Sequence, residues 1–182
     1  MIVDRLVGFI KEKNEAINNH QFMLRYNTPN VTIADHYRYL KQLYLIQKTL
    51  EKKVLACQIV VGLPQEWRFL LHRSELIRKD LLFLKPFIAD SDNKIFPATE
   101  AYVAELEKCE NVLDIWADFL GRVFADLHNG DTFKTQIYEL YSRSELSVKD
   151  GADFFKFEQQ TLYEFKKWVE KQVTLTACME KL

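Results

Sequence analysis

Asn14 is a polar residue at a position where the surrounding pattern places apolar side chains. The other members of its series recur at helical spacing and are Val3, Val7, Ile10 and Ile17. A carboxamide on this face points toward the core, where it needs hydrogen-bond partners. The residues alone therefore predict an asparagine bonded to another helix, unless the rest of the chain assigns this face to a binding site.

The cysteines and histidines do not follow the spacing of common metal sites. Cys57, Cys109 and Cys178 are odd in number, far apart and without a CxxC pair, so they predict reduced, mostly structural thiols. A di-iron centre in a helical bundle needs about six carboxylate and histidine ligands with Glu-x-x-His pairs. Because no such pair occurs in the sequence, we rank a di-iron protein last among the alternatives.

Length and charge suit a single domain spanning residues 1–182 that can bury a substantial core. The chain has 25 Lys and Arg against 26 Asp and Glu, a net charge of -1, and no basic tract. We therefore expect no nucleic-acid partner. Charged residues enter the first five positions, and no stretch reaches the roughly 18 uncharged residues of a membrane span, so the expected location is cytoplasmic.

Helical periodicity dominates, and only five Gly and four Pro interrupt it. The sequence therefore predicts an all-α protein. Thr32, with Asp35 three residues later, should cap the second helix. The expected helices cover roughly residues 4–23, 33–58, 65–86, 98–109, 112–128 and 158–182.

The helix expected after Asn111 is the most apolar and should be central. It reaches His128-Asn129-Gly130-Asp131, where Gly130 can relax the backbone and Asp131 can cap a new helical segment. The helix should therefore either end at this run or kink and resume beyond it.

Short strings along these elements resemble the heme oxygenase family over nearly the whole chain. In chain order they are Phe22-Met23, Leu43-Tyr44 with Leu50-Glu51, Leu71-His72-Arg73 with Asp80-Leu81, Tyr102-Val103 with Leu106, and Phe154-Phe155-Lys156-Phe157. Each string is short, but their order and spacing agree with the family. The resemblance implies a single-domain heme oxygenase-like multi-helix bundle with a kinked central distal helix.

The family clamps heme against that distal helix, which carries a Gly-Asp-Leu-Ser-Gly-Gly motif. Here the motif corresponds to Ala125-Asp126-Leu127-His128-Asn129-Gly130. The resemblance gives Asp126 the proton-relay role, with Arg122 one turn earlier, while Gly130 is retained. Ala125 and Asn129 replace glycines and should crowd this face. His128 could ligate iron from this side, or could be an ordinary bonded or exposed histidine.

The resemblance also places Asn14 where the family has its iron-binding histidine, and a carboxamide is a poor iron ligand. Family members hold the heme propionates with basic residues near the end of the chain, where Lys166, Lys167 and Lys171 lie. A lysine-rich surface helix explains these three lysines equally well. We therefore expect either heme held without the usual ligand or no heme.

Two main functions follow from the resemblance. The first is a divergent protein with atypical or lost heme-degrading activity that binds a tetrapyrrole, another ligand or a protein partner. The alternative is an active heme oxygenase that takes electrons from a reductase and cleaves heme to biliverdin, carbon monoxide and iron with a substitute ligand. A purely structural interaction protein, with Trp67, Trp116 and Trp168 in packing or interface roles, also stays open.

Overall fold

The computed structural model describes residues 24, 26, 28, 30–57, 63–89, 93–147, 151–155 and 163–171, with the backbone alone at 66, 128, 129, 131 and 132. Every regular element in these ranges is a helix, which confirms the all-α prediction. The elements are α3 (Ile33–Ala56), η2 (Gln65–His72), α4 (Arg73–Leu84), η3 (Lys85–Phe87), α5 (Pro97–Lys108), α6 (Val112–Arg143) and η5 (Asp153–Phe155), and residues 163–171 are also helical. None of the described helices is long and apolar enough to cross a membrane.

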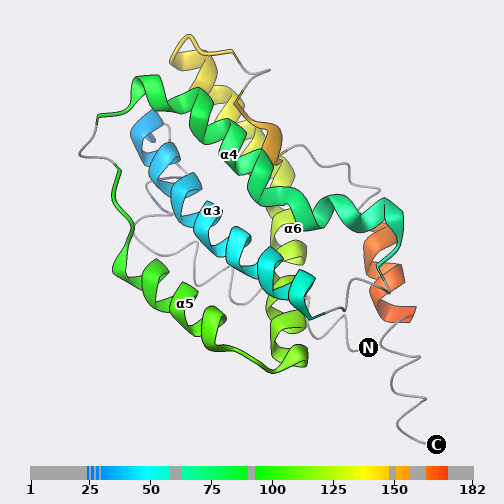
Figure 1. Cartoon of the computed structure of the whole chain (residues 1–182). Helices are drawn as coiled ribbons and strands as arrows, with labels where there is room; N and C mark the ends of the chain where they lie inside the picture. The colour runs from blue at the N-terminus through cyan, green and yellow to red at the C-terminus, as the bar shows by residue number, and fades with distance from the viewer. Residues whose placement is uncertain are drawn as a thin grey trace, which may run out of the picture.

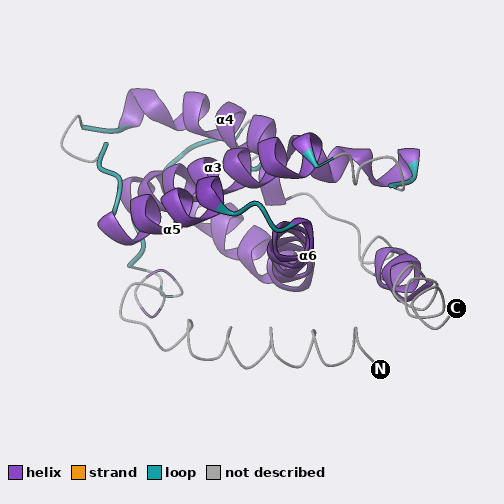
Figure 2. Ribbon diagram, turned by 60° about the horizontal axis from the view of Figure 1, so that its bottom comes forward, coloured by secondary structure: helices purple, strands orange, loops and turns teal. Residues whose placement is uncertain are grey.

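Helix α3 lies at the centre of the described structure and contacts α4, α5 and α6 (Figure 1). The short η5 helix rests on α4 and α6. In the turned view of Figure 2, α6 is seen nearly end-on beside α3 and α5. The bundle therefore brings residues from α3, α4, α6 and η5 to one shared interior.

Local capping begins α3 and α6 where the sequence predicts. The Thr32 hydroxyl accepts from the amide of Asp35 at 3.1 Å, and the Asp35 carboxylate accepts from the amide of Thr32 at 3.1 Å, so the expected capping box is present. The Asn111 side chain accepts from the amide of Leu113 at 2.9 Å and caps α6. Each cap satisfies amides that have no partner inside the helix.

The expectation that the central helix ends at residues 128–131 is wrong, because α6 continues as an α-helix to Arg143. The alternative, a kink followed by a resumed helix, agrees with the structure only in that the helix extends beyond this run, because α6 is one uninterrupted α-helix there. The reason is that its buried face does not stop there: Leu127 precedes the run, and Ile137 and Leu140 follow it, all three in the core. Packing on both sides overrides the glycine signal.

The single helix expected over 65–86 is instead the 3-10 helix η2 followed by α4. The boundary between η2 and α4 is explained by hydrogen bonds to Glu51 of α3. The buried Glu51 carboxylate accepts from the amide of Ser74 at 2.8 Å and from the Ser74 hydroxyl, while His72 supplies no side-chain cap. A side chain from another helix therefore starts α4.

Two apolar clusters form the described core. The first joins α3, η2, α6 and helix 163–171 and includes Val54, Trp67, Phe119, Phe124 and Phe165. The second joins α3, α4, α6 and η5 and includes Leu43, Ile77, Ile137, Tyr141 and Phe155. Trp67 is buried, and the partly buried Trp116 and Trp168 pack against the first cluster. An interface role for these tryptophans stays a prediction.

Gly151 approaches other side chains too closely to carry one of its own. Its carbonyl accepts the hydroxyl of Tyr141. A Cβ built on Gly151 would lie 2.9 Å from the Tyr141 ring and closer still to the ring of Phe83. Residues 151–155 can therefore lie against α4 and α6 only because this position has no side chain.

Gly151→Ala should destabilise the protein by about 1–3 kcal/mol, because the new methyl must displace two packed rings. Gly121→Ala is the matched control, since a Cβ at Gly121 in α6 meets no atom of the described residues within 4 Å. That substitution should stabilise by up to about 1 kcal/mol through helix propensity. Urea unfolding followed by circular dichroism measures both. Equal effects of the two substitutions would contradict the packing described for Gly151.

Candidate functional site

Asp126 lies at the centre of a charged cluster inside the bundle. Its side chain is buried, and its Oδ1 accepts from Arg122, one turn earlier on α6. Its Oδ2 lies 3.6 Å from Nε of Arg73 at the start of α4. One carboxylate therefore faces two guanidinium groups from two different helices.

Arg73 is the more deeply buried of these two arginines, with 1% of its surface exposed. It donates to the carbonyl of Phe154 at 2.7 Å, and its guanidinium lies 4.1 Å from the centre of the Phe154 ring. Burial lowers the pKa of Arg73 to about 10, and Asp126 partly opposes this shift. Arg73 thus stays charged at neutral pH and depends on its partners.

Arg122 is partly exposed and connects the charged cluster to α3. It hydrogen-bonds with the Tyr39 side chain as well as with Asp126. Burial disfavours its charged form, but the attraction of Asp126 and Tyr39 outweighs that cost, so the pKa of Arg122 is raised. Burial raises the pKa of Tyr39 despite the opposing effect of Arg122, so its hydroxyl stays protonated.

A second polar contact lies along α6 toward its N-terminus. Asp118 hydrogen-bonds with Tyr102 of α5, and burial followed by repulsion from Asp114 raises the pKa of Asp118. Asp118, Arg122 and Asp126 stand four residues apart and form a row of alternating charge on one side of α6. This row links α6 to both α5 and α3.

The structure places four of the predicted site residues on α6. Asp126 and Arg122 form an ion pair, Ala125 is half-buried and Gly130 is buried. Their predicted catalytic and heme-binding roles stay predictions. The side chains of His128 and Asn129 and the whole of Asn14 lie outside the described residues. Their predicted roles also stay predictions.

The three predicted propionate-binding lysines lie on helix 163–171. This helix packs Phe165 against Phe124 of α6, with 5.5 Å between ring centres. Lys166 is half-buried, whereas Lys167 and Lys171 face solvent, and Lys167 lies over the ring of Tyr163 at 4.4 Å. Because two of the three point outward, this arrangement agrees with a lysine-rich surface helix.

Sequence reasoning did not identify Arg73 or Tyr39 as members of the cluster, and it did not identify His36 as a core residue. A signal for His36 existed in the sequence, because His36 belongs to a stripe of residues at helical spacing on α3. That stripe is buried throughout and comprises His36, Leu40, Leu43, Gln47, Leu50 and Val54. Arg73 gave no such signal, since an arginine at a helix start usually faces water.

The two histidines whose side chains are described are a core residue and a surface residue. Histidine is a common protein ligand of heme iron. His36 is fully buried among aromatic rings, and His72 is exposed on the surface. The Asp126 carboxylate faces Arg73 and Arg122. Among the described side chains, the structure therefore shows no histidine ligand for a heme iron beside Asp126.

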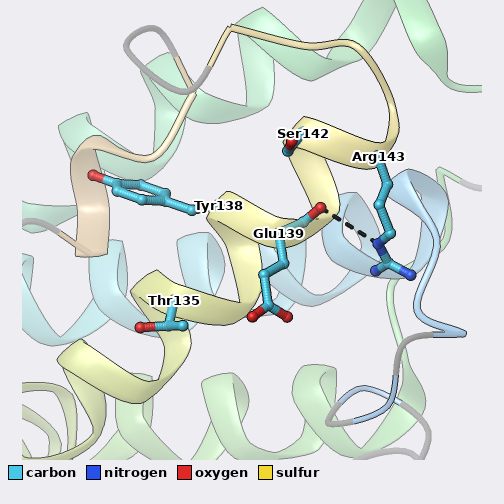
Figure 3. Close-up of a pocket in the computed structure, with 5 residues that line it drawn as sticks. All are labelled: Thr135, Tyr138, Glu139, Ser142 and Arg143. Atoms are coloured by element: carbon cyan, nitrogen blue, oxygen red, sulfur yellow. Dashed lines mark hydrogen bonds between the residues drawn. The ribbon is translucent and has the colours of Figure 1, made fainter.

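A hollow of about 550 Å³ lies elsewhere, along the C-terminal half of α6. It is lined by Thr135, Tyr138, Glu139, Ser142 and Arg143 (Figure 3). Apart from half-buried Tyr138, these residues are exposed, and Arg143 donates to the Glu139 carbonyl at 3.3 Å. Figure 3 shows their polar groups spreading in different directions. The hollow is a surface feature of one helix and contains none of the predicted site residues.

Comparison with protein-family models, with curated proteins and with solved structures finds no significant match to this chain. The resemblance to heme oxygenases therefore rests on the sequence strings alone.

Asp126→Asn should destabilise the protein by about 3–5 kcal/mol, because it leaves the buried Arg73 and the partly buried Arg122 without their shared anion. The matched control is Glu75→Gln, which breaks the exposed ion pair with Arg78. An exposed pair contributes about 1 kcal/mol or less. Chemical denaturation measures the loss in free energy of unfolding for both variants. A loss at Asp126 no larger than that at Glu75 would show that the cluster is not a stabilising ion network.

Proposed function

We propose that this chain is a divergent heme oxygenase-like protein that has lost heme-degrading activity and acts by binding a ligand or a protein partner. Support comes first from the all-helical bundle, in which α3, α4, α5 and α6 follow the expected order. The observation that carries the proposal is the state of Asp126, whose carboxylate is held between Arg73 and Arg122.

A proton-relay carboxylate must be able to exchange protons with water next to the reacting group. Asp126 is buried, and its Oδ1 and Oδ2 face the guanidinium groups of Arg122 and Arg73. Moving Asp126 toward a substrate would leave Arg73 buried beside an empty space. The same residue that the resemblance assigns to catalysis thus forms an ion pair between α6 and the first residue of α4.

The state of the histidines also supports lost activity. The resemblance puts Asn14 where the family has its iron ligand, and of the described histidines His36 is enclosed in the core and His72 is exposed on the surface. The expected crowding from Ala125 acts in the same direction, since this residue is half-buried on α6. A chain that lacks the ligand and uses the relay carboxylate for packing has little means of activating oxygen.

One observation favours the alternative of an active enzyme. Asp126, Arg122 and Tyr39 form a continuous chain from a carboxylate through a guanidinium to a hydroxyl. Arg122 is partly exposed, with 25% of its side chain accessible, so this chain reaches the surface. Such an arrangement could hold ordered water. A hemin titration distinguishes the two functions.

A hemin titration of the purified protein, followed by ascorbate or a generic reductase, tests the proposal. We expect no biliverdin absorbance, because Asp126 is committed to Arg73 and Arg122 and the usual ligand is absent. Optical spectra record both the Soret band and any loss of heme. A saturable one-to-one Soret band followed by biliverdin would overturn the proposal and support the active enzyme.

A companion variant, Asn14→His, tests the cause of the expected inactivity. It should raise hemin affinity at least about tenfold and give a histidine-ligated ferric spectrum, because imidazole ligates iron and a carboxamide does so poorly. Asn14→Gln is the matched control, since it keeps the carboxamide and should leave the spectrum unchanged. An Asn14→His spectrum identical to that of the original chain would refute the placement of residue 14 beside a heme.

A further inference from the structure

His36 is a fully buried histidine whose two ring nitrogens have different surroundings. Its Nδ1 lies 2.7 Å from the hydroxyl of Tyr26. Its Nε2 is buried and has no hydrogen-bond partner among the described residues. A neutral ring tolerates this environment, whereas a protonated ring would place a charged N–H where the described residues offer no acceptor.

Aromatic rings from three directions enclose His36. The centre of its ring lies 5.8 Å from that of Tyr141 on α6, 6.0 Å from that of Phe155 in η5 and 6.1 Å from that of Tyr26. Tyr141 also donates to the carbonyl of Gly151. Two of the three covering rings therefore belong to, or are bonded to, residues 151–155.

Residues 151–155 form a short described segment that covers His36. Their polar anchors are the Asp80 carboxylate, which accepts from the amides of Asp153 and Phe154 at 3.0 and 3.1 Å, and Arg73, which donates to the Phe154 carbonyl. By contrast, α3 and α6 are long helices. Local opening of a short 3-10 segment requires less free energy than unfolding a long packed helix, so water reaches His36 more readily by opening this segment than by unfolding α3 or α6.

We propose that His36 is an acid-sensitive latch: acidification favours an opened form in which residues 151–155 have left α3 and His36 is exposed and protonated. The proton comes from solvent and binds Nε2, and no other bond changes. The closed form is kept at neutral pH in the tautomer whose Nδ1–H donates to the Tyr26 oxygen, because the neutral ring then packs against Phe155 with no proton on Nε2.

Several other titratable groups face this region. On α3 they are Asp35 and Tyr39; beyond it they are Tyr26, Tyr141 of α6, Asp153 of η5 and Asp80 of α4. Burial raises the pKa of Tyr26, Tyr39 and Tyr141, so none of these hydroxyls titrates below neutral pH. The carboxyl of Asp80 holds residues 153 and 154 directly, so its contribution must be separated from that of His36 by variants.

The size of the pH effect on opening follows from the difference between the pKa of His36 in the closed form and its pKa in the opened form. Burial lowers the pKa of His36 to about 3 in the closed form, against 6.5 for an exposed histidine. The folded pKa is the lower one, so stability of the closed form is complete above pH 6.5 and is lost as the pH falls below it. Between about pH 7.5 and pH 5 the opening equilibrium should rise about 30-fold.

Amide hydrogen exchange measures this equilibrium directly, once each rate is divided by the intrinsic rate at that pH. The amides of Asp153, Phe154 and Phe155 are hydrogen-bonded in the closed form and report opening. Their protection should fall about 30-fold from pH 7.5 to pH 5, while the amides of buried α6 residues such as Ile137 and Leu140 keep theirs. An equal fall in α6 would indicate global unfolding and would overturn the latch.

His36→Asn removes the titrating ring but keeps an N–H donor near the Tyr26 oxygen, and it should abolish the pH response. If that variant folds poorly, the double variant Tyr26→Phe with His36→Phe replaces both polar partners with apolar rings and serves the same purpose. His72→Asn is the matched control, because His72 is exposed and its loss should leave the response intact. A response that persists without His36 would assign it to Asp80 and refute the proposal.

Discussion

The buried guanidinium of Arg73 is the constraint on which the described packing depends. Burial of a charge is tolerated only when it has suitable partners, and these come from two other elements: the Phe154 carbonyl in η5, which accepts a hydrogen bond, and the Asp126 carboxylate on α6, which forms an ion pair. Because Arg73 is the first residue of α4, these contacts set where α4 begins relative to both partners. Asp80 reinforces the arrangement two turns later by accepting amides from η5.

Helices α3 and α6 each contribute to both apolar clusters, and on α3 a buried charge lies between them. Along α6, Phe124 belongs to the first cluster and Ile137 to the second. On α3 the buried Glu51 lies between Val54 of the first cluster and Leu43 of the second. Polar groups that must find specific partners fix how helices slide past one another, which apolar surfaces alone specify less strictly.

Local signals predicted the helix starts well, because a capping residue and its target amide are close in sequence. Thr32 with Asp35 and Asn111 with Leu113 are such cases. The continuation of α6 past Gly130 and the enclosure of Arg73 and His36 depend on residues from other elements. No window of sequence contains both partners of these contacts, so pattern reasoning could place Asp126 beside Arg122 but could not supply Arg73.

The cap that α4 receives from Glu51 has a consequence for how the chain folds. Helix α3 carries its own capping box, so its first turn can form from neighbouring residues alone. The amide and hydroxyl of Ser74 instead depend on a carboxylate 23 residues earlier, at the far end of α3. A nascent α4 therefore lacks a partner for its first turn until the chain has closed a loop back onto α3. We infer that α3 forms early and that α4 gains its N-terminus only as it docks.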